Sequence, residues 1–181
     1  MSSLAIVLMI VFTGPATARD SACVAEDLCE SSADPCLIST DFDLEDGCLF
    51  DFGSRGVVLE RGVLLHPDDG SVSLRAGSLT IERYAGFQGR EAGESGGLLT
   101  IELEGDLVSE GNIRLQGQPS GGSLQIETGG SITLSKGSVS AGGPVRSANG
   151  GQIGFKAEGD IFIGAPLDAL GARRGLDVAQ D

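Results

Sequence analysis

The sequence predicts an all-β protein whose chain winds into a parallel β-helix of about four to five short coils, behind an N-terminal segment that holds all the cysteines. Three observations predict this fold. Short runs of alternating apolar and polar residues are typical of strands with one buried face. Glycines separate these runs, as tight turns require. The runs recur at nearly constant spacing, which indicates stacked repeats.

The repeat is clearest when Gly97, Gly122 and Gly151 are aligned as equivalent origins. A looser copy begins at Gly70, so successive origins are 27, 25 and 29 residues apart. Matching positions are then Leu99, Leu124 and Ile153; Ile101, Ile126 and Phe155; Gly105, Gly130 and Gly159; and Leu107, Ile132 and Ile161. Within one copy we expect three short strands, at 123–127, 132–134 and 139–141.

Stacking of the copies follows from the small size of one coil. A single coil buries few apolar side chains, and its glycines raise the entropy cost of ordering it. The hydrogen bonds that offset this cost must therefore form between coils, as in other solenoids. A small antiparallel sandwich of hairpins is the alternative. We favour the solenoid because a sandwich does not require evenly spaced glycine pairs.

The N-terminus predicts export. Residues 4–12 form an unbroken apolar run, and Ala16-Thr17-Ala18 follows as a cleavage site, so we interpret residues 1–18 as a signal peptide. The run is shorter than the roughly 20 residues that span a bilayer. The alternative is a buried strand or helix at the N-terminus. We expect a protein that is secreted or held at the cell surface, with no membrane span.

The rest of the chain divides by composition into three parts: an acidic, disulfide-linked cap at 19–48, the β-helix repeats at 49–171, and a tail or truncated end at 172–181. The cap contains Cys23, Cys29, Cys36 and Cys48. Export makes two disulfides the expected state. Three pairings are open, of which Cys23–Cys29 with Cys36–Cys48 encloses the shortest loops. A zinc site is the alternative, but no C-x-x-C pair or nearby histidine supports it.

The formal net charge of −14 disfavours nucleic acid and anionic lipid as partners, since both are bound by Lys and Arg. It favours cations and basic partners. The densest acids are Asp41, Asp43, Glu45 and Asp46, a weak candidate for calcium that lacks EF-hand spacing. An acidic, solvated loop is the preferred interpretation. We expect no other cofactor and no resident metal.

Candidate catalytic residues are few. His66 is the single histidine, and its position beside Pro67 favours a strand end or turn. Asp106 and Asp160 follow the glycine at the same repeat offset, so we expect them two coils apart, roughly 10 Å at about 4.8 Å per layer. Aspartate after glycine stabilises turns through its own backbone, and we assign both residues this role rather than a glycosidase role.

A lyase-type site needs clustered acids and a basic residue on one face. Glu102, Glu104 and Arg114 could supply them, but the pattern does not select them over ordinary outward strand residues. We therefore predict no catalytic residue. A carbohydrate-active β-helix enzyme, of the polysaccharide lyase or glycoside hydrolase kind, is the alternative function.

The phrases GGSLxI, GGSITL and GSVSAGG, and the phrase GGxIxFxAEGDIxI, resemble repeats of filamentous-haemagglutinin-type and related bacterial extracellular parallel β-helix proteins over 49–171. The resemblance implies a right-handed β-helix that is secreted or surface-displayed, with a structural or adhesive, non-catalytic role. Such proteins usually have many more coils, and the secretion domain that opens their two-partner members is not evident here.

From the predicted fold we expect an extended outer β-face to bind protein or glycan surfaces through outward residues such as Thr100, Gln125 and Thr133. An uncapped last coil near 161–167 would leave a free strand edge and favour end-to-end self-association.

Overall fold

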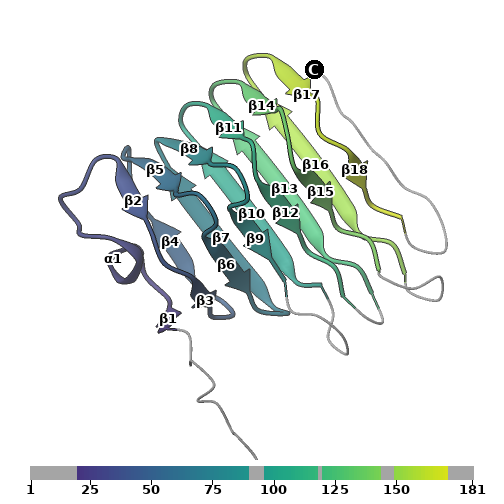
Figure 1. Ribbon diagram of the computed structural model, residues 1–181, viewed down its shortest axis with the longest axis horizontal. Coiled ribbons are helices and arrows are strands. Elements are labelled where there is room, and N and C mark those ends of the chain that lie inside the picture. The colour runs from purple at the N-terminus through teal and green to yellow at the C-terminus, as the bar shows by residue number, and fades with distance from the viewer. Residues whose placement is uncertain (1–19, 90–95, 118–119, 144–148, 171–181) are drawn as a thin grey trace, which may run out of the picture.

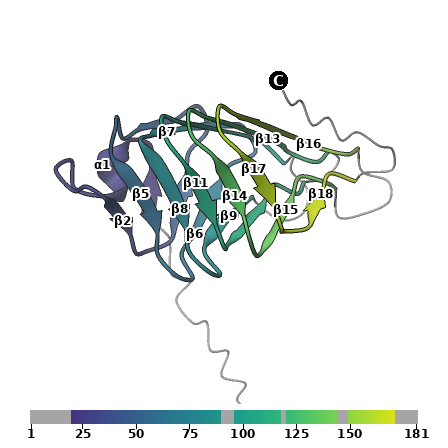
Figure 2. The ribbon, with the colours of Figure 1, turned by 90° about the horizontal axis from the view of Figure 1, so that it is seen from above.

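The computed structural model describes residues 20–89, 96–117, 120–143 and 149–170, and they form a parallel β-helix (Figure 1). The coils follow one another along the long axis, from the purple N-terminal coil to the yellow C-terminal one (Figure 1). The strands build three sheets, here called A, B and C, and every pairing between them is parallel. Each complete coil visits C, B and A in that order (Figure 2). The predicted fold class is confirmed.

Sheet C contains the longest strands. Its members are β4 (Leu49–Asp51), β7 (Ser71–Ala76), β10 (Leu98–Leu103), β13 (Ser123–Thr128) and β16 (Gln152–Ala157). The register places Leu99 beside Leu124 and Leu124 beside Ile153, as the repeat predicts, and Val72 joins the same row, as its place in the copy from Gly70 predicts. All four side chains are buried. One continuous row of the core therefore passes through four coils.

Sheet B repeats the pattern with shorter strands. Its members are β2 (Cys36–Ile38), β5 (Gly56–Leu59), β8 (Ser78–Ile81), β11 (Leu107–Ser109), β14 (Ile132–Leu134) and β17 (Ile161–Ile163). Leu107, Ile132 and Ile161 are register neighbours, again as predicted. Alternation along each strand turns the middle residue outward and its two neighbours toward the core.

Sheet A closes the coil. Its members are β1 (Asp20–Ala22), β3 (Phe42–Leu44), β6 (Leu64–Pro67), β9 (Gly86–Gln88), β12 (Asn112–Arg114), β15 (Ser138–Ser140) and β18 (Leu167–Asp168). Phe87, Ile113 and Val139 form its buried central row. The three strands expected within one copy correspond to β13, β14 and β15.

The unequal repeat spacing arises outside the sheets. Paired strands of sheet C keep their register although Val72, Leu99, Leu124 and Ile153 are unevenly separated in sequence. The connections from sheet A to sheet C differ most in length, from residues 68–70 to residues 141–151. Most of the extra residues are thus accommodated at this corner of the coil.

Glycines form a column at the corner between sheets C and B. The N–H of Gly105 donates to Gly77 O, that of Gly130 to Gly105 O, and that of Gly159 to Gly130 O, at 2.7, 3.2 and 2.9 Å. Gly77 occupies this column although it comes one residue early in the alignment, because the corner before β8 is shorter. Successive coils therefore approach closely here.

Substitution of Gly137 measures how strictly a corner of the coil requires glycine. Its φ is +76°, and an added Cβ would collide with the carbonyl oxygen of Gly111 in the preceding coil. We expect Gly137→Ala to lower the free energy of unfolding by roughly 2–3 kcal/mol, measured by urea denaturation. Gly154→Ala is the matched control, because a Cβ at Gly154 would make only an ordinary contact, 3.9 Å from Leu124 O, and its φ lies outside the left-handed region. Equal stabilities of the two variants would contradict this account.

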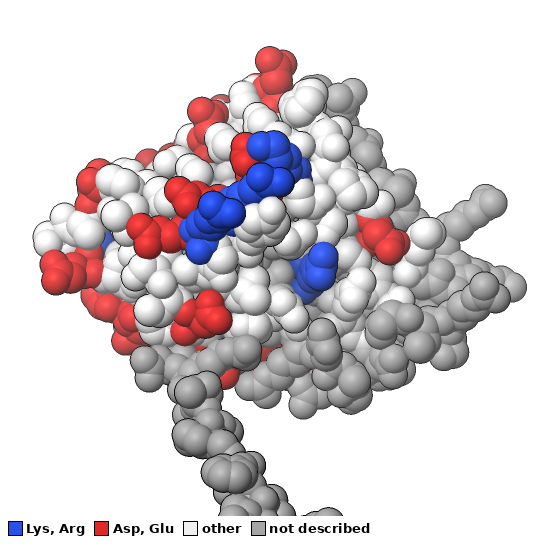
Figure 3. All heavy atoms as spheres, viewed as in Figure 1, with Lys and Arg blue, Asp and Glu red and all other residues white. Residues whose placement is uncertain are grey.

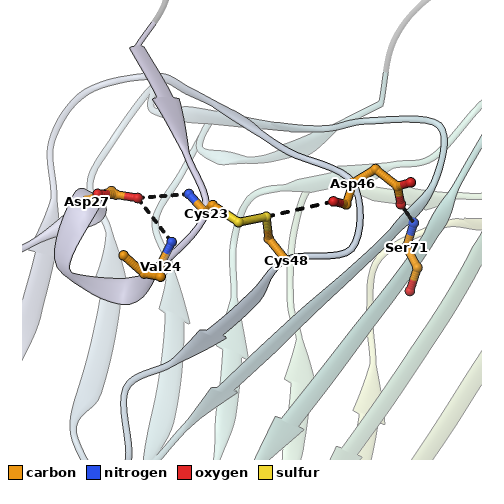
Figure 4. The surroundings of a disulfide bond; sticks show 6 residues. All are labelled: Cys23, Val24, Asp27, Asp46, Cys48 and Ser71. Atoms are coloured by element: carbon orange, nitrogen blue, oxygen red, sulfur yellow. Dashed lines mark hydrogen bonds between the residues drawn. A yellow bond between two sulfur atoms is a disulfide. The ribbon is translucent and has the colours of Figure 1, made fainter.

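The N-terminal coil is covered by α1 (Ala25–Leu28) and held by two disulfides, which confirms a cysteine-containing cap. The bonds are Cys23–Cys48 and Cys29–Cys36, so the nested pairing is present rather than the one with the shortest loops. Cys23 lies ahead of α1 and Cys48 just ahead of β4 (Figure 4). The Cys23–Cys48 bond therefore joins the cap to the first strand of sheet C.

A carboxylate also orders the cap. The N–H groups of Cys23 and Val24 donate to Asp27 Oδ2 at 2.9 and 3.0 Å (Figure 4). These two hydrogen bonds, that from Cys23 first, hold the pKa of Asp27 below its ordinary value. A lowered carboxyl pKa stabilises the fold above the ordinary pKa, and this contribution is lost as the pH falls through the lowered value.

The ladder begins within the segment expected to be a cap, since β2 already pairs with β5 and β3 with β6. The predicted signal peptide at 1–18 and the tail at 172–181 lie outside the described residues. Within the described ranges, no helix has the length and apolar character needed to cross a membrane.

Candidate functional site

The outer surface of sheet C is the candidate site. Alternation along its six-residue strands turns three residues per coil away from the core. Two of the outward rows run from β7 to β16: the first is Ser73, Thr100, Gln125 and Gly154, and the second is Arg75, Glu102, Glu127 and Lys156, with Leu49 and Asp51 of β4 preceding them. We call the eight positions from β7 to β16 the sheet C face. Because all pairings are parallel and in register, each row is straight and repeats at the strand spacing of about 4.8 Å.

Two ion pairs join neighbouring coils on this face. Arg75 Nε lies 2.6 Å from Glu102 Oε2, and Lys156 Nζ lies 2.6 Å from Glu127 Oε1. All four side chains are about half exposed or more, so the pairs add little stability. Their main effect is on charge. Glu102 and Glu127 are register neighbours in adjacent strands. Arg75 neutralises Glu102 from the preceding strand, and Lys156 neutralises Glu127 from the following strand.

The face has two hollows. One is a shallow groove lined by the side chains of Asp51, Arg75, Glu102, Glu104 and Glu127. The other, here called the Gly154 notch, lies over the last strands of the sheet. Its polar lining is Thr100, Glu102, Gln125, Glu127, Gln152 and Lys156, with Gly154 among them.

Thr100 and Gln125, two of the predicted binding residues, are neighbours on the sheet C face, but Thr133 is not part of it. Thr133 belongs to the outward row of sheet B, between Val108 and Phe162. The three residues are therefore divided between two faces of the solenoid. The sheet B row carries no charged side chain: its members are Leu37, Val58, Thr80, Val108, Thr133 and Phe162.

The structure brings together only part of the set considered for a lyase-type site. Glu102 and Glu104 line the groove on sheet C, whereas Arg114 lies on β12 in sheet A. The basic residue of the groove is Arg75, which was not among the candidates. Arg75 occupies the same repeat offset from Gly70 as Glu102 does from Gly97, so the alignment could have identified it.

The acids of the N-terminal segment receive hydrogen bonds from the next coil. Asp41 Oδ1 accepts from the N–H of Leu64 at 2.8 Å, and Asp46 Oδ1 accepts from the N–H of Ser71 at 2.6 Å (Figure 4). Asp43 is the register neighbour of His66 in sheet A. Asp41, Asp43 and Asp46 therefore lie at different places on the coil. Calcium binding by the acids of this segment stays a prediction.

Glu45 lies with Cys23 and Cys48 in the one close grouping of potential metal ligands within the described residues. Both cysteines are in the Cys23–Cys48 disulfide, so they offer no thiolate to a metal. This grouping therefore does not make a metal site.

Asp106 and Asp160 lie beside the corner column and two coils apart, as expected, but the Asp106 carboxylate accepts a hydrogen bond from the next coil rather than from the backbone of its own turn. Asp106 Oδ1 accepts from the N–H of Ser131 at 2.7 Å, and Ser131 Oγ accepts from the N–H of Asp160 at 3.2 Å. Ser131 thus lies between the two aspartates in the intervening coil. The hydrogen bond to the Asp106 carboxylate links one coil to the next, so this carboxylate has a structural role.

His66 lies in β6 and is buried. Its Nδ1 is 3.1 Å from the carbonyl oxygen of Gln88 on β9, so the ring links neighbouring strands of sheet A. His66 is followed by the last residue of β6, which agrees with the strand-end alternative for this residue.

Acidic side chains are spread over the face drawn in Figure 3, where several Lys and Arg side chains form a short row and others lie apart from it.

Tyr84 has a φ of +68° at a corner between sheets B and A, and the guanidinium carbons of Arg61 and Arg83 lie 5.4 and 5.0 Å from its ring centre. Glu82 Oε2 accepts from the N–H of Arg61, which ties this corner to the preceding coil.

Comparison with known proteins gives no relative: no family model, curated protein or solved structure matches the chain.

Proposed function

We propose that this protein is an exported, non-catalytic β-helix protein with a structural or adhesive role at the cell surface or in the extracellular space, and that the sheet C face is its contact surface. The observation that carries the proposal is the regularity of this face. Its second outward row is exposed and charged, and its first row is partly exposed with polar side chains at Ser73, Thr100 and Gln125. Extended in-register surfaces suit repetitive partners such as glycans or fibrous proteins.

Export is supported by two features. The apolar run at 4–12 followed by Ala16-Thr17-Ala18 is typical of a signal peptide. The pairing of all four cysteines in two disulfides is compatible with an oxidising compartment.

The test is a binding measurement on isolated cell envelopes and extracellular matrix from the source cells, using the full chain produced in an oxidising compartment. Gln125→Arg places a long cation at the centre of the sheet C face and should reduce binding at least fivefold. Thr133→Arg makes the same addition in the same coil but on sheet B, and should leave binding unchanged. Equal binding by both variants and the native chain would reject the sheet C face as the contact surface.

A second function, polysaccharide lyase, is favoured by the groove of Asp51, Glu102, Glu104 and Glu127 beside Arg75. Lyases that act on uronic acid polymers need acids, often with calcium, and a basic residue near the substrate carboxylate. The assay is ultraviolet detection of unsaturated uronide formed from polygalacturonate or alginate with calcium present. Product that disappears in Arg75→Ala would establish this function in place of the non-catalytic one.

A further inference from the structure

Gly154 is a glycine that the fold does not require. It lies inside β16, a six-residue strand of sheet C. Its φ is outside the left-handed region, and the nearest atom to an added Cβ would be Leu124 O at 3.9 Å, an ordinary contact. By contrast, Gly130 and Gly151 each face backbone or side-chain atoms that a Cβ would strike.

A glycine inside a strand weakens it, and such a residue often marks a place where a ligand or another backbone approaches closely. Gly154 continues the outward row of Thr100 and Gln125, where every other member has a side chain. Because the side chain is missing, the backbone of Gly154 itself forms part of the lining of the Gly154 notch.

The lining of the notch indicates the chemistry of its ligand. Both carboxylates are already paired, Glu102 with Arg75 and Glu127 with Lys156. The local charge is therefore balanced, although the chain as a whole carries −14. The groups that remain for a ligand are the exposed amides of Gln125 and Gln152 and the hydroxyl of Thr100, which donate and accept hydrogen bonds without net charge.

We infer that the Gly154 notch binds a neutral glycan, whose hydroxyl groups hydrogen-bond to the amides of Gln125 and Gln152 while one sugar ring lies against the bare backbone at Gly154. The rows above it repeat at about 4.8 Å, close to the length of one sugar in an extended chain, so further sugars can follow the sheet toward Ser73. This inference rests on the proposed function and names the ligand class of the same face.

The decisive variant is Gly154→Thr, which fills the notch with a residue that favours strands. It should fold at least as well as the native chain, because it removes a strand glycine at a conformation that other residues adopt. It should also weaken glycan binding at least tenfold. Val108→Thr, on the exposed outward row of sheet B, introduces the same residue away from the sheet C face and is the control, so it should bind as the native chain does.

The experiment titrates the full, disulfide-bonded chain with hexasaccharides of cellulose, chitin and mannan, and with oligogalacturonate as the acidic comparison, by ¹⁵N NMR. The expected result is a response to a neutral hexasaccharide at the Gly154 amide and the Gln125 and Gln152 side-chain amides, lost in Gly154→Thr. Three results would overturn the inference: no response to any neutral sugar, a response to the acidic sugar alone, or full binding by Gly154→Thr at unchanged melting temperature.

These outcomes are distinct from failure of the proposed function. If envelope binding is lost in Gln125→Arg while no neutral sugar is bound, the sheet C face remains the contact surface and its partner is a protein or a charged polymer. If a neutral sugar binds in the notch but envelopes are not bound, glycan recognition stands and the adhesive role is wrong.

Discussion

Leu124→Ala is expected to lower the free energy of unfolding by about 3 kcal/mol, a large share of the stability of a domain of this size. Leu124 is 1% exposed and lies in the middle coil of a continuous row, with Leu99 and Ile153 as its register neighbours. Truncation removes apolar contacts and leaves a cavity that strands on both sides cannot fill, because their backbones are fixed by the ladders.

Urea denaturation followed by circular dichroism measures this effect. Gln125→Ala is the matched control, since it truncates the adjacent residue of the same strand on the opposite side and should change stability by less than about 0.5 kcal/mol. If both variants unfolded at the same urea concentration, Leu124 would not be a core residue and the solenoid would be wrong.

Removing the Cys23–Cys48 disulfide should have the second large effect. The bond closes a sequence separation of 25 residues, whereas Cys29–Cys36 closes 7. The loss of loop-closure entropy in the unfolded chain predicts a cost of about 3.5 kcal/mol for the first bond and about 2.3 kcal/mol for the second. The first bond also holds the cap against the start of β4, so its loss exposes the first coil.

The paired variants Cys23→Ser/Cys48→Ser and Cys29→Ser/Cys36→Ser test this order. Thermal unfolding should show the larger decrease in melting temperature for the first pair. A larger decrease for the second pair would mean that the short loop around 29–36, and not the junction with β4, limits the stability of the N-terminal coil.

The core of this fold was predictable from the sequence because one alignment determines the strand register. Once Gly97, Gly122 and Gly151 are equivalent, parallel stacking requires Leu99, Leu124 and Ile153 to share a row, and they do. The resemblance to filamentous-haemagglutinin-type proteins agrees with the observed parallel β-helix, and the specific family is not shown.

The features that were not predictable depend on distances across the coil. Disulfide pairing follows from which cysteines the first coil brings together, and loop length alone would have favoured Cys23–Cys29 over the observed Cys23–Cys48. The division of Thr133 from Thr100 depends on which sheet each strand joins. In contrast, the ion pair of Arg75 with Glu102 could have been predicted from the sequence, since the two residues share a repeat offset.

The corner between sheets A and C accepts connections of different length, while every strand stays in register with its neighbours. A gene that duplicated the segment from Gly97 to Gly121 in frame would add one complete winding, and neither the cap nor the final strands would need new contacts. Descendants of this protein could therefore grow or shrink in steps of one winding, and each step would change the reach of the molecule while leaving its cross-section the same.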